Sequence, residues 1–213
     1  CFMKNSQILY LASSSKYRQQ AVQEAKINFQ IISQTSQEIC DYDLEFNKIV
    51  ESIAINKMYH IVLPQSLMPG SGCVKKGDEI FVLTADTMTQ DSHGKIHGKP
   101  ENIEDCIRKI KAVSGKSLTG TAFCLDKKVF DGTNWVTENR HLESVSSTCD
   151  FEIAPKWYED YIANTDALNC CGALDITGYG AQFLKSVTGS YSAILGLPMF
   201  EINRALEKIN FFK

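Results

Sequence analysis

The stretch from Glu79 to Pro100 constrains the fold of this chain most, because it joins a buried strand to a charged turn. The apolar run Ile80–Leu83, with its β-branched and aromatic side chains, is typical of a strand buried on both faces. Asp86 follows, where we expect the strand to reach the surface. The turn Asp91–Gly94 then reverses the chain and returns Lys99 toward Asp86. Such a carboxylate and ammonium suit a metal ion with a phosphate, although an ordinary hairpin with solvated side chains fits the same residues.

Composition limits the partners of the chain. Its 213 residues, 44% of them hydrophobic, are enough for the core of one domain or two small lobes. The 22 Lys and Arg residues against 25 Asp and Glu give a formal net charge of −3, so we expect no general affinity for nucleic acid. A phosphate site must therefore be local. The eight cysteines form no C-x-x-C pair and predict reduced thiols of a cytoplasmic protein. No apolar run reaches the ~18 residues of a membrane-spanning helix, so we expect no membrane association.

Three consecutive serines connect the first predicted strand to the first predicted helix. Residues Gln7–Ala12 favour a strand, and Ser13–Ser15 supply a loop and an N-cap for a helix over Lys16–Lys26. Backbone N–H groups and hydroxyls at such a junction are suited to binding an anion. Arg18 lies in the first helical turn, where the helix dipole disfavours a cation. We therefore expect Arg18 to bind something outside the helix; an exposed arginine without a function is the alternative.

The helix predicted over Leu44–Val62 carries one charged residue on its apolar face. The apolar positions of that face are Phe46, Ile49, Val50, Ile53 and Ala54. Lys57 follows Ile53 by four residues and so continues the stripe toward the buried side. A buried ammonium without a partner is costly. Lys57 therefore either pairs with an anion or extends its ammonium to solvent.

The remaining segments complete an α/β pattern. Further helices are predicted over Glu101–Val113, Pro155–Asn164 and Met199–Asn210, and further strands over Asn28–Ser33, Leu118–Leu125, Trp135–Phe151 and Gln182–Val187. In the first of these helices the expected core positions are Ile103, Cys106, Ile107, Ile110 and Val113. Three glycines between Cys170 and Gly180 allow close backbone approach to a ligand or to a neighbouring strand. The order predicts a mixed sheet flanked by helices, in two lobes with a cleft between them.

Short motifs spread along most of the chain resemble, in order, those of the Maf family. They are Leu11-Ala12-Ser13 through Arg18, Ala54-x-x-Lys57, Ala85-Asp86-Thr87, Gly98-Lys99-Pro100, Ser114-Gly115, Gly172-Ala173 and GSYSAILGLP at 189–198. The resemblance implies one Maf-like domain over the whole chain, with an elongated mixed sheet in two lobes, an inosine triphosphatase-like fold and a central nucleotide cleft. It also implies a metal-dependent nucleoside triphosphate pyrophosphatase, a homodimer in the cytoplasm.

The resemblance gives the cationic residues a shared task. Ser15 and Arg18 would bind the triphosphate at the strand-to-helix turn. Lys57 and Lys99 would neutralise the triphosphate from the other side, and Lys99 would contribute to catalysis.

Two carboxylates complete the implied site. Glu38 aligns with the acidic residue that the family carries after its second strand, and with Asp86 it would bind Mg²⁺ or Mn²⁺. Asp86 would also orient or deprotonate the water that attacks the α-phosphorus, while pyrophosphate leaves. The implied catalytic residues are therefore Asp86, Glu38 and Lys99.

Three positions depart from the common family pattern and bear on the substrate. Many members carry Arg, Lys and Gln where this chain has Tyr17, Cys170 and Thr177. These residues resemble instead the branch that acts on 7-methyl-GTP, in which an aromatic face would attract the charged base by ~0.5 to 2 kcal/mol. Tyr17 could instead pack on Ala21 and Ala25, and Thr177, although counted among the substrate-binding residues, lacks the carboxylate or amide that would recognise a base edge.

Two further functions are compatible with the sequence. One is the dTTP/UTP pyrophosphatase branch of the same family. The other is a nucleotide-binding regulator of cell division without turnover. The presence of Glu38, Lys57, Asp86 and Lys99 argues against such a regulator, because binding alone would not require all four.

Overall fold

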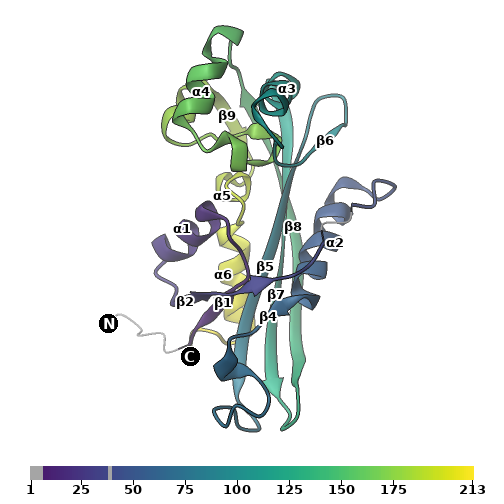
Figure 1. The fold of residues 1–213 in the computed structure, drawn as a ribbon, viewed down its shortest axis with the longest axis vertical. Helices are drawn as coiled ribbons and strands as arrows, with labels where there is room; N and C mark the ends of the chain where they lie inside the picture. Colours follow the sequence, from purple (N-terminus) through teal and green to yellow (C-terminus); the bar gives the residue numbers. More distant parts are fainter. Residues whose placement is uncertain (1–6, 38–39) are drawn as a thin grey trace. The chain divides into compact units, whose positions relative to one another are not determined.

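A large mixed sheet with helices around it forms the centre of the fold (Figure 1). The computed structural model describes residues 7–37 and 40–213. The strands follow the order β2-β1-β5-β7-β8-β9, with β6 paired to β5. Their bounds are Leu9–Leu11 (β1), Phe29–Ile31 (β2), Glu79–Gln90 (β5), Ile96–His97 (β6), Gly115–Phe130 (β7), Trp135–Phe151 (β8) and Leu184–Thr188 (β9). β1 is parallel to β2 and β5, whereas β6 and β9 are antiparallel to the strands they pair with. The predicted α/β fold class is confirmed.

The helices follow the predicted order. The α-helices of the described residues are Lys16–Glu24 (α1), Phe46–Tyr59 (α2), Ile103–Val113 (α3), Tyr158–Asn164 (α4), Tyr191–Ile194 (α5) and Met199–Lys208 (α6). Short 3₁₀ turns span Gln65–Leu67, Pro155–Trp157, Ala167–Asn169, Cys171–Ala173 and Gly178–Phe183. Within these residues no helix combines the length and the apolar composition that crossing a bilayer requires.

Several predicted boundaries are wrong, and two of them have a clear cause. The second helix ends at Tyr59 rather than Val62, because Ile61–Val62 forms β4 and pairs with β3, Ser33–Gln34. The last strand begins at Leu184 rather than Gln182, because the preceding residues form a 3₁₀ turn.

The chain folds into two compact units, which are described separately below. Among the described residues, unit 1 comprises residues 7–37, 40–86, 122–144 and 195–213, and unit 2 comprises residues 87–121 and 145–194. The long strands β5, β7 and β8 contribute residues to both units, and the division within β5 falls between Asp86 and Thr87.

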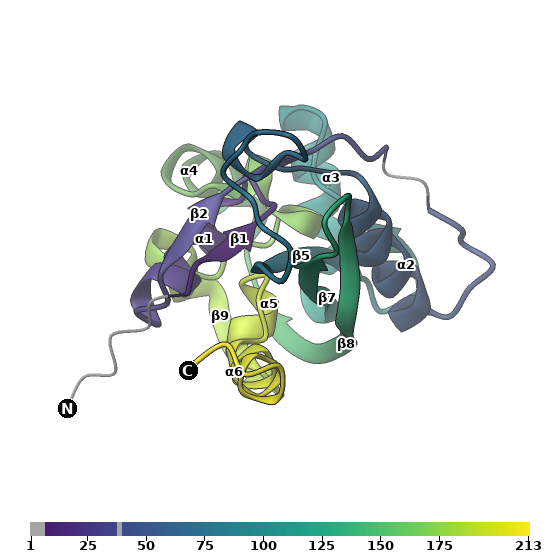
Figure 2. The same ribbon diagram turned by 90° about the horizontal axis from the view of Figure 1, so that it is seen from below.

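Unit 1 has two apolar layers, one on each face of its strands. Odd-numbered residues of β1 and β5, such as Leu9 and Phe81, pack with residues of α1 and α6. Even-numbered residues, such as Tyr10 and Val82, pack with Met58 of α2. Figures 1 and 2 show α2 on the opposite side of these strands from α1 and α6. The two-residue periodicity of a strand thus assigns each β5 side chain to one of two helical layers.

Unit 2 encloses an aromatic cluster under its helices. Tyr161 of α4 is fully buried against Phe151 and Phe183, with ring centroids 5.6 and 5.8 Å away. The buried Tyr161 hydroxyl donates to the Ala173 carbonyl oxygen at 2.9 Å. In α3 the expected core positions Cys106, Ile110 and Val113 are buried.

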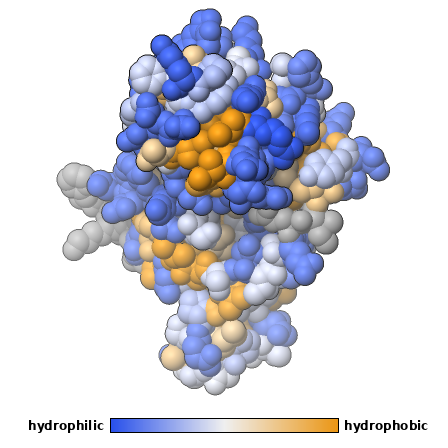
Figure 3. All heavy atoms as spheres, turned by 45° about the horizontal axis from the view of Figure 1, so that its top comes forward, coloured by the Kyte–Doolittle hydropathy of each residue, from blue (hydrophilic) through white to orange (hydrophobic). Residues whose placement is uncertain are grey.

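Ile103 was expected in the core of the same helix, and this prediction is wrong. It lies at the first position of α3 and is 59% exposed, whereas Asp105 and Cys106, two and three positions later, are buried. The face drawn in Figure 3 is mostly hydrophilic but carries patches of apolar side chains. Other large exposed apolar residues include Tyr59 and Phe200.

Candidate functional site

A buried ion pair between Lys57 and Asp86 forms the centre of the candidate site in unit 1. The Lys57 Nζ atom lies 2.6 Å from Asp86 Oδ1, and the two residues are 7% and 6% exposed. The position of the pair follows from the periodicities of α2 and β5. Asp86 and Thr84 are even-numbered residues on the α2 face of β5, and the Thr84 hydroxyl donates to the Ala54 carbonyl oxygen at 2.7 Å. One helical turn after Ala54 comes Lys57, which meets Asp86 two residues after Thr84.

The burial of the pair excludes a solvent-extended Lys57 and contradicts the predicted surface position of Asp86. Lys57 is buried beside a carboxylate, so it does not extend its ammonium to solvent. Asp86 was expected to reach the surface at a strand end, and this is wrong: β5 continues to Gln90, and Asp86 is buried within it. The strand continues because the residues beyond Asp86 keep a strand-like alternation of hydroxyl and apolar side chains. The predicted hairpin is present, with Thr89 opposite His97 and Gln90 opposite Ile96.

The serine turn lies next to this ion pair in unit 1. Ser15 is the N-cap of α1, and its hydroxyl accepts from the Arg18 N–H at 3.5 Å. The Arg18 guanidinium reaches over the turn and donates from Nη1 to the Ala85 carbonyl oxygen at 2.9 Å and from Nε to the Gly196 carbonyl oxygen at 2.9 Å. Ala85 precedes Asp86 in β5. The structure therefore links the serine turn to the ion pair: Arg18, whose N–H donates to Ser15, is bonded to the Ala85 carbonyl beside Asp86, and Asp86 pairs with Lys57.

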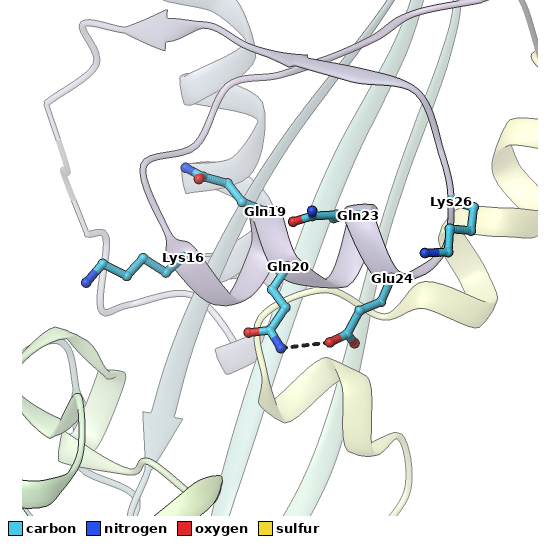
Figure 4. A pocket seen from close by; sticks show the side chains of 6 residues that line it. All are labelled: Lys16, Gln19, Gln20, Gln23, Glu24 and Lys26. Atoms are coloured by element: carbon cyan, nitrogen blue, oxygen red, sulfur yellow. Dashed lines mark hydrogen bonds between the residues drawn. The ribbon is translucent and has the colours of Figure 1, made fainter.

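A surface hollow runs along the exposed side of α1 (Figure 4). Its lining consists of Lys16, Gln19, Gln20, Gln23, Glu24 and Lys26. The Gln20 side chain donates to Glu24 at 2.7 Å. None of the predicted site residues lines this hollow, and we assign it no function. The predicted aromatic residue Tyr17 lies on the same helix and is partly buried.

In unit 2, the structure places Lys99 beside the Cys170 segment. Lys99 is exposed in the loop after β6, and its carbonyl oxygen accepts from the Lys109 ammonium at 2.6 Å. The preceding carbonyl, that of Gly98, accepts from the Gly172 N–H at 3.0 Å. Burial raises the pKa of the Cys170 thiol, and the nearby Lys99 charge acts in the opposite direction. Cys170 is therefore a neutral thiol at physiological pH.

Thr177, also in unit 2, is bonded to a buried carboxylate. Its N–H and its hydroxyl both donate to Asp175 Oδ1, at 3.0 and 2.8 Å. The other Asp175 oxygen accepts from the Asp166 N–H at 2.8 Å. Gly180 packs against the same segment so closely that a Cβ would lie 1.9 Å from the Asp175 carbonyl oxygen. The close backbone approach predicted for the glycines of this segment is therefore present at Gly180, where the neighbour is the Asp175 backbone. The Thr177 hydroxyl is oriented toward Asp175.

The carboxylates predicted to hold a metal ion are only partly placed. Glu38 lies outside the described residues. Asp86 offers the carboxylate oxygens that Mg²⁺ prefers, with Oδ1 also accepting from Lys57. Within residues 7–37 and 40–213, no group of three or more His, Cys, Asp and Glu side chains is arranged to hold a metal ion. The donor type of Asp86 fits a hard divalent cation, and the rest of the ligand set remains a prediction.

Several residues that organise these sites were not predicted. Thr84 sets the register between α2 and β5, but a threonine within an apolar strand carries no distinctive signal. Asp105 and Lys109 hold the Lys99 loop. Asp105 had a signal, because Asn102 followed three residues later by an acidic residue is typical of a helix N-terminus. Lys109 had no such signal.

A comparison with protein families covers nearly the whole chain. The family model described as Maf-like protein matches residues 8–209. This chain belongs to the Maf-like family. The predicted resemblance is therefore confirmed, and the mixed sheet flanked by helices agrees with that family's fold.

Curated relatives of this Maf-like protein carry two kinds of name. A dTTP/UTP pyrophosphatase from Hydrogenovibrio crunogenus is 29% identical over 207 residues, covering 96% of this chain and 97% of the relative. One from Fusobacterium nucleatum is 30% identical over 207 residues, covering 95% and 96%. A 7-methyl-GTP pyrophosphatase from Syntrophotalea carbinolica is 25% identical over 203 residues, covering 92% and 91%. These names describe hydrolases of phosphoric anhydride bonds in nucleoside triphosphates.

Proposed function

We propose that this Maf-like protein is a nucleoside triphosphate pyrophosphatase, which hydrolyses a nucleoside triphosphate to the monophosphate and pyrophosphate. The buried Lys57–Asp86 pair carries the proposal, because it lies beside a serine turn at a helix N-terminus. Helix N-termini favour anions, so the phosphate groups of a nucleotide can bind beside the pair. The names of the full-length relatives support the same activity.

Each residue has a role that its surroundings make chemically reasonable. Ser15 and the first turn of α1 would bind phosphate oxygens, and Lys57 would neutralise charge that develops in the transition state. Asp86 would orient or deprotonate the attacking water, with its position fixed by Lys57 and the Thr84–Ala54 bond. Arg18 would act through its bonds to Ala85 and Gly196 as well as through its charge.

We further propose that Asp86 and Glu38 hold Mg²⁺ or Mn²⁺. A bound divalent cation would polarise the phosphoryl oxygens and neutralise charge on the triphosphate. Lys99 would add positive charge to the bound triphosphate and contribute to catalysis.

For the base we retain 7-methyl-GTP as the leading substrate, with dTTP and UTP as the alternative. Tyr17 on α1 supports 7-methyl-GTP, because an aromatic face attracts a cationic base. The names of two of the relatives above support dTTP and UTP instead. Thr177 does not favour either base, since its hydroxyl already donates to Asp175.

The test is a panel of nucleoside triphosphates that includes 7-methyl-GTP, GTP, dTTP, UTP, dCTP and ATP. Each is incubated with the protein and Mg²⁺, and released pyrophosphate is separated from released phosphate. We expect pyrophosphate and the monophosphate, at a rate that falls more than a hundredfold in Asp86→Asn. The matched control is Asp78→Asn, the same change at an exposed aspartate near the start of β5. Absence of turnover with every nucleotide would refute the enzyme, and full activity of Asp86→Asn would refute the role of Asp86.

The same panel separates the substrate branches and the regulator. Preference for dTTP or UTP over 7-methyl-GTP would remove the role proposed for Tyr17. Nucleotide binding without turnover would identify a regulator.

We also propose that the protein is a homodimer. The exposed apolar patches in Figure 3 are compatible with an interface. Light scattering on the protein as it elutes from a sizing column would measure its mass and so test the dimer.

A further inference from the structure

The loop that carries Lys99 is fastened on both sides by polar contacts within unit 2. On its N-terminal side, the buried residues Asp91 and His97 close the β5–β6 hairpin, with Asp91 Oδ2 2.7 Å from His97 Nε2. The other Asp91 oxygen accepts from the His93 and Lys95 N–H groups, at 2.9 and 3.0 Å. One carboxylate thus fixes the whole turn. Burial opposes ionisation of Asp91, but the His97 and backbone hydrogen bonds outweigh it and hold its pKa below the ordinary value.

On the C-terminal side, α3 fastens the loop through Asp105 and Lys109. Asp105 Oδ2 accepts from the Glu101 N–H at 3.0 Å and lies 3.1 Å from the Lys109 ammonium. That ammonium also donates to the Lys99 carbonyl oxygen at 2.6 Å. The Lys109 side chain is only 12% exposed, and that of Asp105 is 8% exposed. A charged donor shared between a carboxylate and a carbonyl is among the stronger hydrogen-bond arrangements.

These contacts have a consequence for the Lys99 ammonium. A lysine on an unrestrained loop would lose loop and side-chain entropy when it bound a phosphate. The backbone of Lys99 is already held at its own carbonyl, at the Gly98 carbonyl through Gly172 and at the Glu101 N–H. Much of that entropy is therefore lost on folding rather than on binding.

We propose that Lys109, held by Asp105, is a positioning residue that presents the Lys99 ammonium to the triphosphate. Lys109 acts through the Lys99 backbone and touches neither the substrate nor the reacting atoms. This inference rests on the proposed function, in which Lys99 binds the triphosphate. It assigns to α3 a role in substrate binding beyond core packing.

The test is a double-substitution cycle on pyrophosphate release from the nucleotide that the panel identifies. Lys109→Met removes the donor and keeps the length of the side chain. We expect Lys109→Met to lower kcat/KM about tenfold, mainly through a higher KM, because the loop must then be ordered on binding. In a Lys99→Met background the same change should have little further effect. An equal loss in both backgrounds would overturn the proposal, because Lys109 would then act independently of Lys99.

Two matched variants separate positioning from charge and from folding. Lys109→Arg keeps a charged donor, and we expect it to restore kcat/KM to within about threefold of the unsubstituted protein. Lys111→Met removes the same charge from the same helix at an exposed site over the Tyr158 ring, and we expect a change below twofold. We call the contacts of Asp105 and Lys109 with the Lys99 loop the clamp. An effect of Lys111→Met as large as that of Lys109→Met would mean that the overall positive charge of α3, not the clamp, sets the affinity for the triphosphate.

Hydrogen exchange on the full chain without nucleotide gives a readout that does not depend on activity. Lys109→Met should speed exchange of the Glu101 amide and leave that of Cys106, inside α3, unchanged. Unchanged protection of Glu101 would overturn the clamp itself. If the unsubstituted protein hydrolyses no triphosphate, the proposed function fails and the positioning role fails with it. The exchange data then show whether the clamp exists as a structural feature alone.

Discussion

At the scale of single residues, the buried Lys57–Asp86 pair is better explained by chemistry than by stability. Removing two charges from water costs several kcal/mol per ion, and their attraction often only offsets that cost. An apolar pair of similar volume at 57 and 86 would serve the core as well, since Ala54, one helical turn before Lys57, is fully buried. The retained charges are therefore consistent with a function that needs a carboxylate held in a fixed position.

Substitutions at the pair should separate these contributions. Lys57→Met leaves Asp86 buried without its cation, so we expect it to lower the free energy of unfolding by about 3 to 5 kcal/mol. Adding Asp86→Leu removes the uncompensated charge and should restore most of that loss. Urea denaturation of the two single variants and the double variant measures the coupling. Additive losses in the double variant would contradict a direct interaction between the two residues.

The sequence predicted the location of these residues better than their partners. Lys57 was placed on the buried side of its helix from periodicity alone, and that is confirmed. Its partner was not predicted, because only the register set by Thr84 and Ala54 aligns Lys57 with Asp86. Arg18 was expected to bind outside its helix, and its bonds to Ala85 and Gly196 depend on chain segments far away in sequence.

At the scale of elements, α3 combines a capped N-terminus with its hold on the preceding loop. Asn102 is the N-cap, and its side chain accepts from the Asp105 N–H at 2.9 Å. Asp105 reaches back to the Glu101 N–H, so the two side chains satisfy backbone donors reciprocally at the helix start. Acidic residues in this first turn also interact favourably with the helix dipole. The helix was predicted from its apolar spacing, but the outward-facing Ile103 was not, because spacing alone does not show where the covered part of a helix begins.

Asp105 should make part of the stability depend on pH in the acid range. The hydrogen bond from the Glu101 backbone, followed by those from Lys109 and Arg108, lowers its pKa from 3.8 to about 2, with burial opposing. The folded state then binds the proton less readily than the unfolded state. Its stabilisation is present above about pH 4 and is lost as the pH falls toward 2. The upper limit of this stabilisation by Asp105 is about 2 kcal/mol. Solvent screening reduces it, because the Arg108 partner is exposed.

Asp105→Asn tests this linkage. The difference in unfolding free energy between the unsubstituted protein and Asp105→Asn should be largest near pH 5 and should shrink toward pH 2. Urea titrations at several pH values, monitored by circular dichroism, measure it. Asp160→Asn, in the first turn of α4, is the matched control on another helix. A difference independent of pH would show that the carboxylate charge of Asp105 does not stabilise the fold.

At the scale of the whole molecule, the charge balance makes any attraction for a polyanion local. The net charge is −3, so the affinity for a triphosphate must come from a few cations near the site. The family and the α/β class were predictable because ordered motifs and apolar periodicities extend over nearly the whole chain. The base preference was not, because Tyr17 and Thr177 each admit more than one role and the relatives carry two kinds of name.

Nucleotide binding should raise the thermal stability of the protein in a metal-dependent way. A ligand that binds only the folded state at a hundred times its Kd adds about 2.7 kcal/mol, which for a chain of this size corresponds to a Tm rise of roughly 5 to 10 °C. We expect this rise with Mg²⁺ and a non-hydrolysable triphosphate analogue together. Either component alone should give a smaller rise, because the cation and the phosphates neutralise each other in the site.

In Asp86→Asn the analogue should still bind through the lysine and arginine side chains, but the rise in Tm should no longer depend on Mg²⁺. A rise of equal size with and without Mg²⁺ in the unsubstituted protein would contradict metal binding at Asp86. A rise that duplex DNA also produces would contradict a local phosphate site.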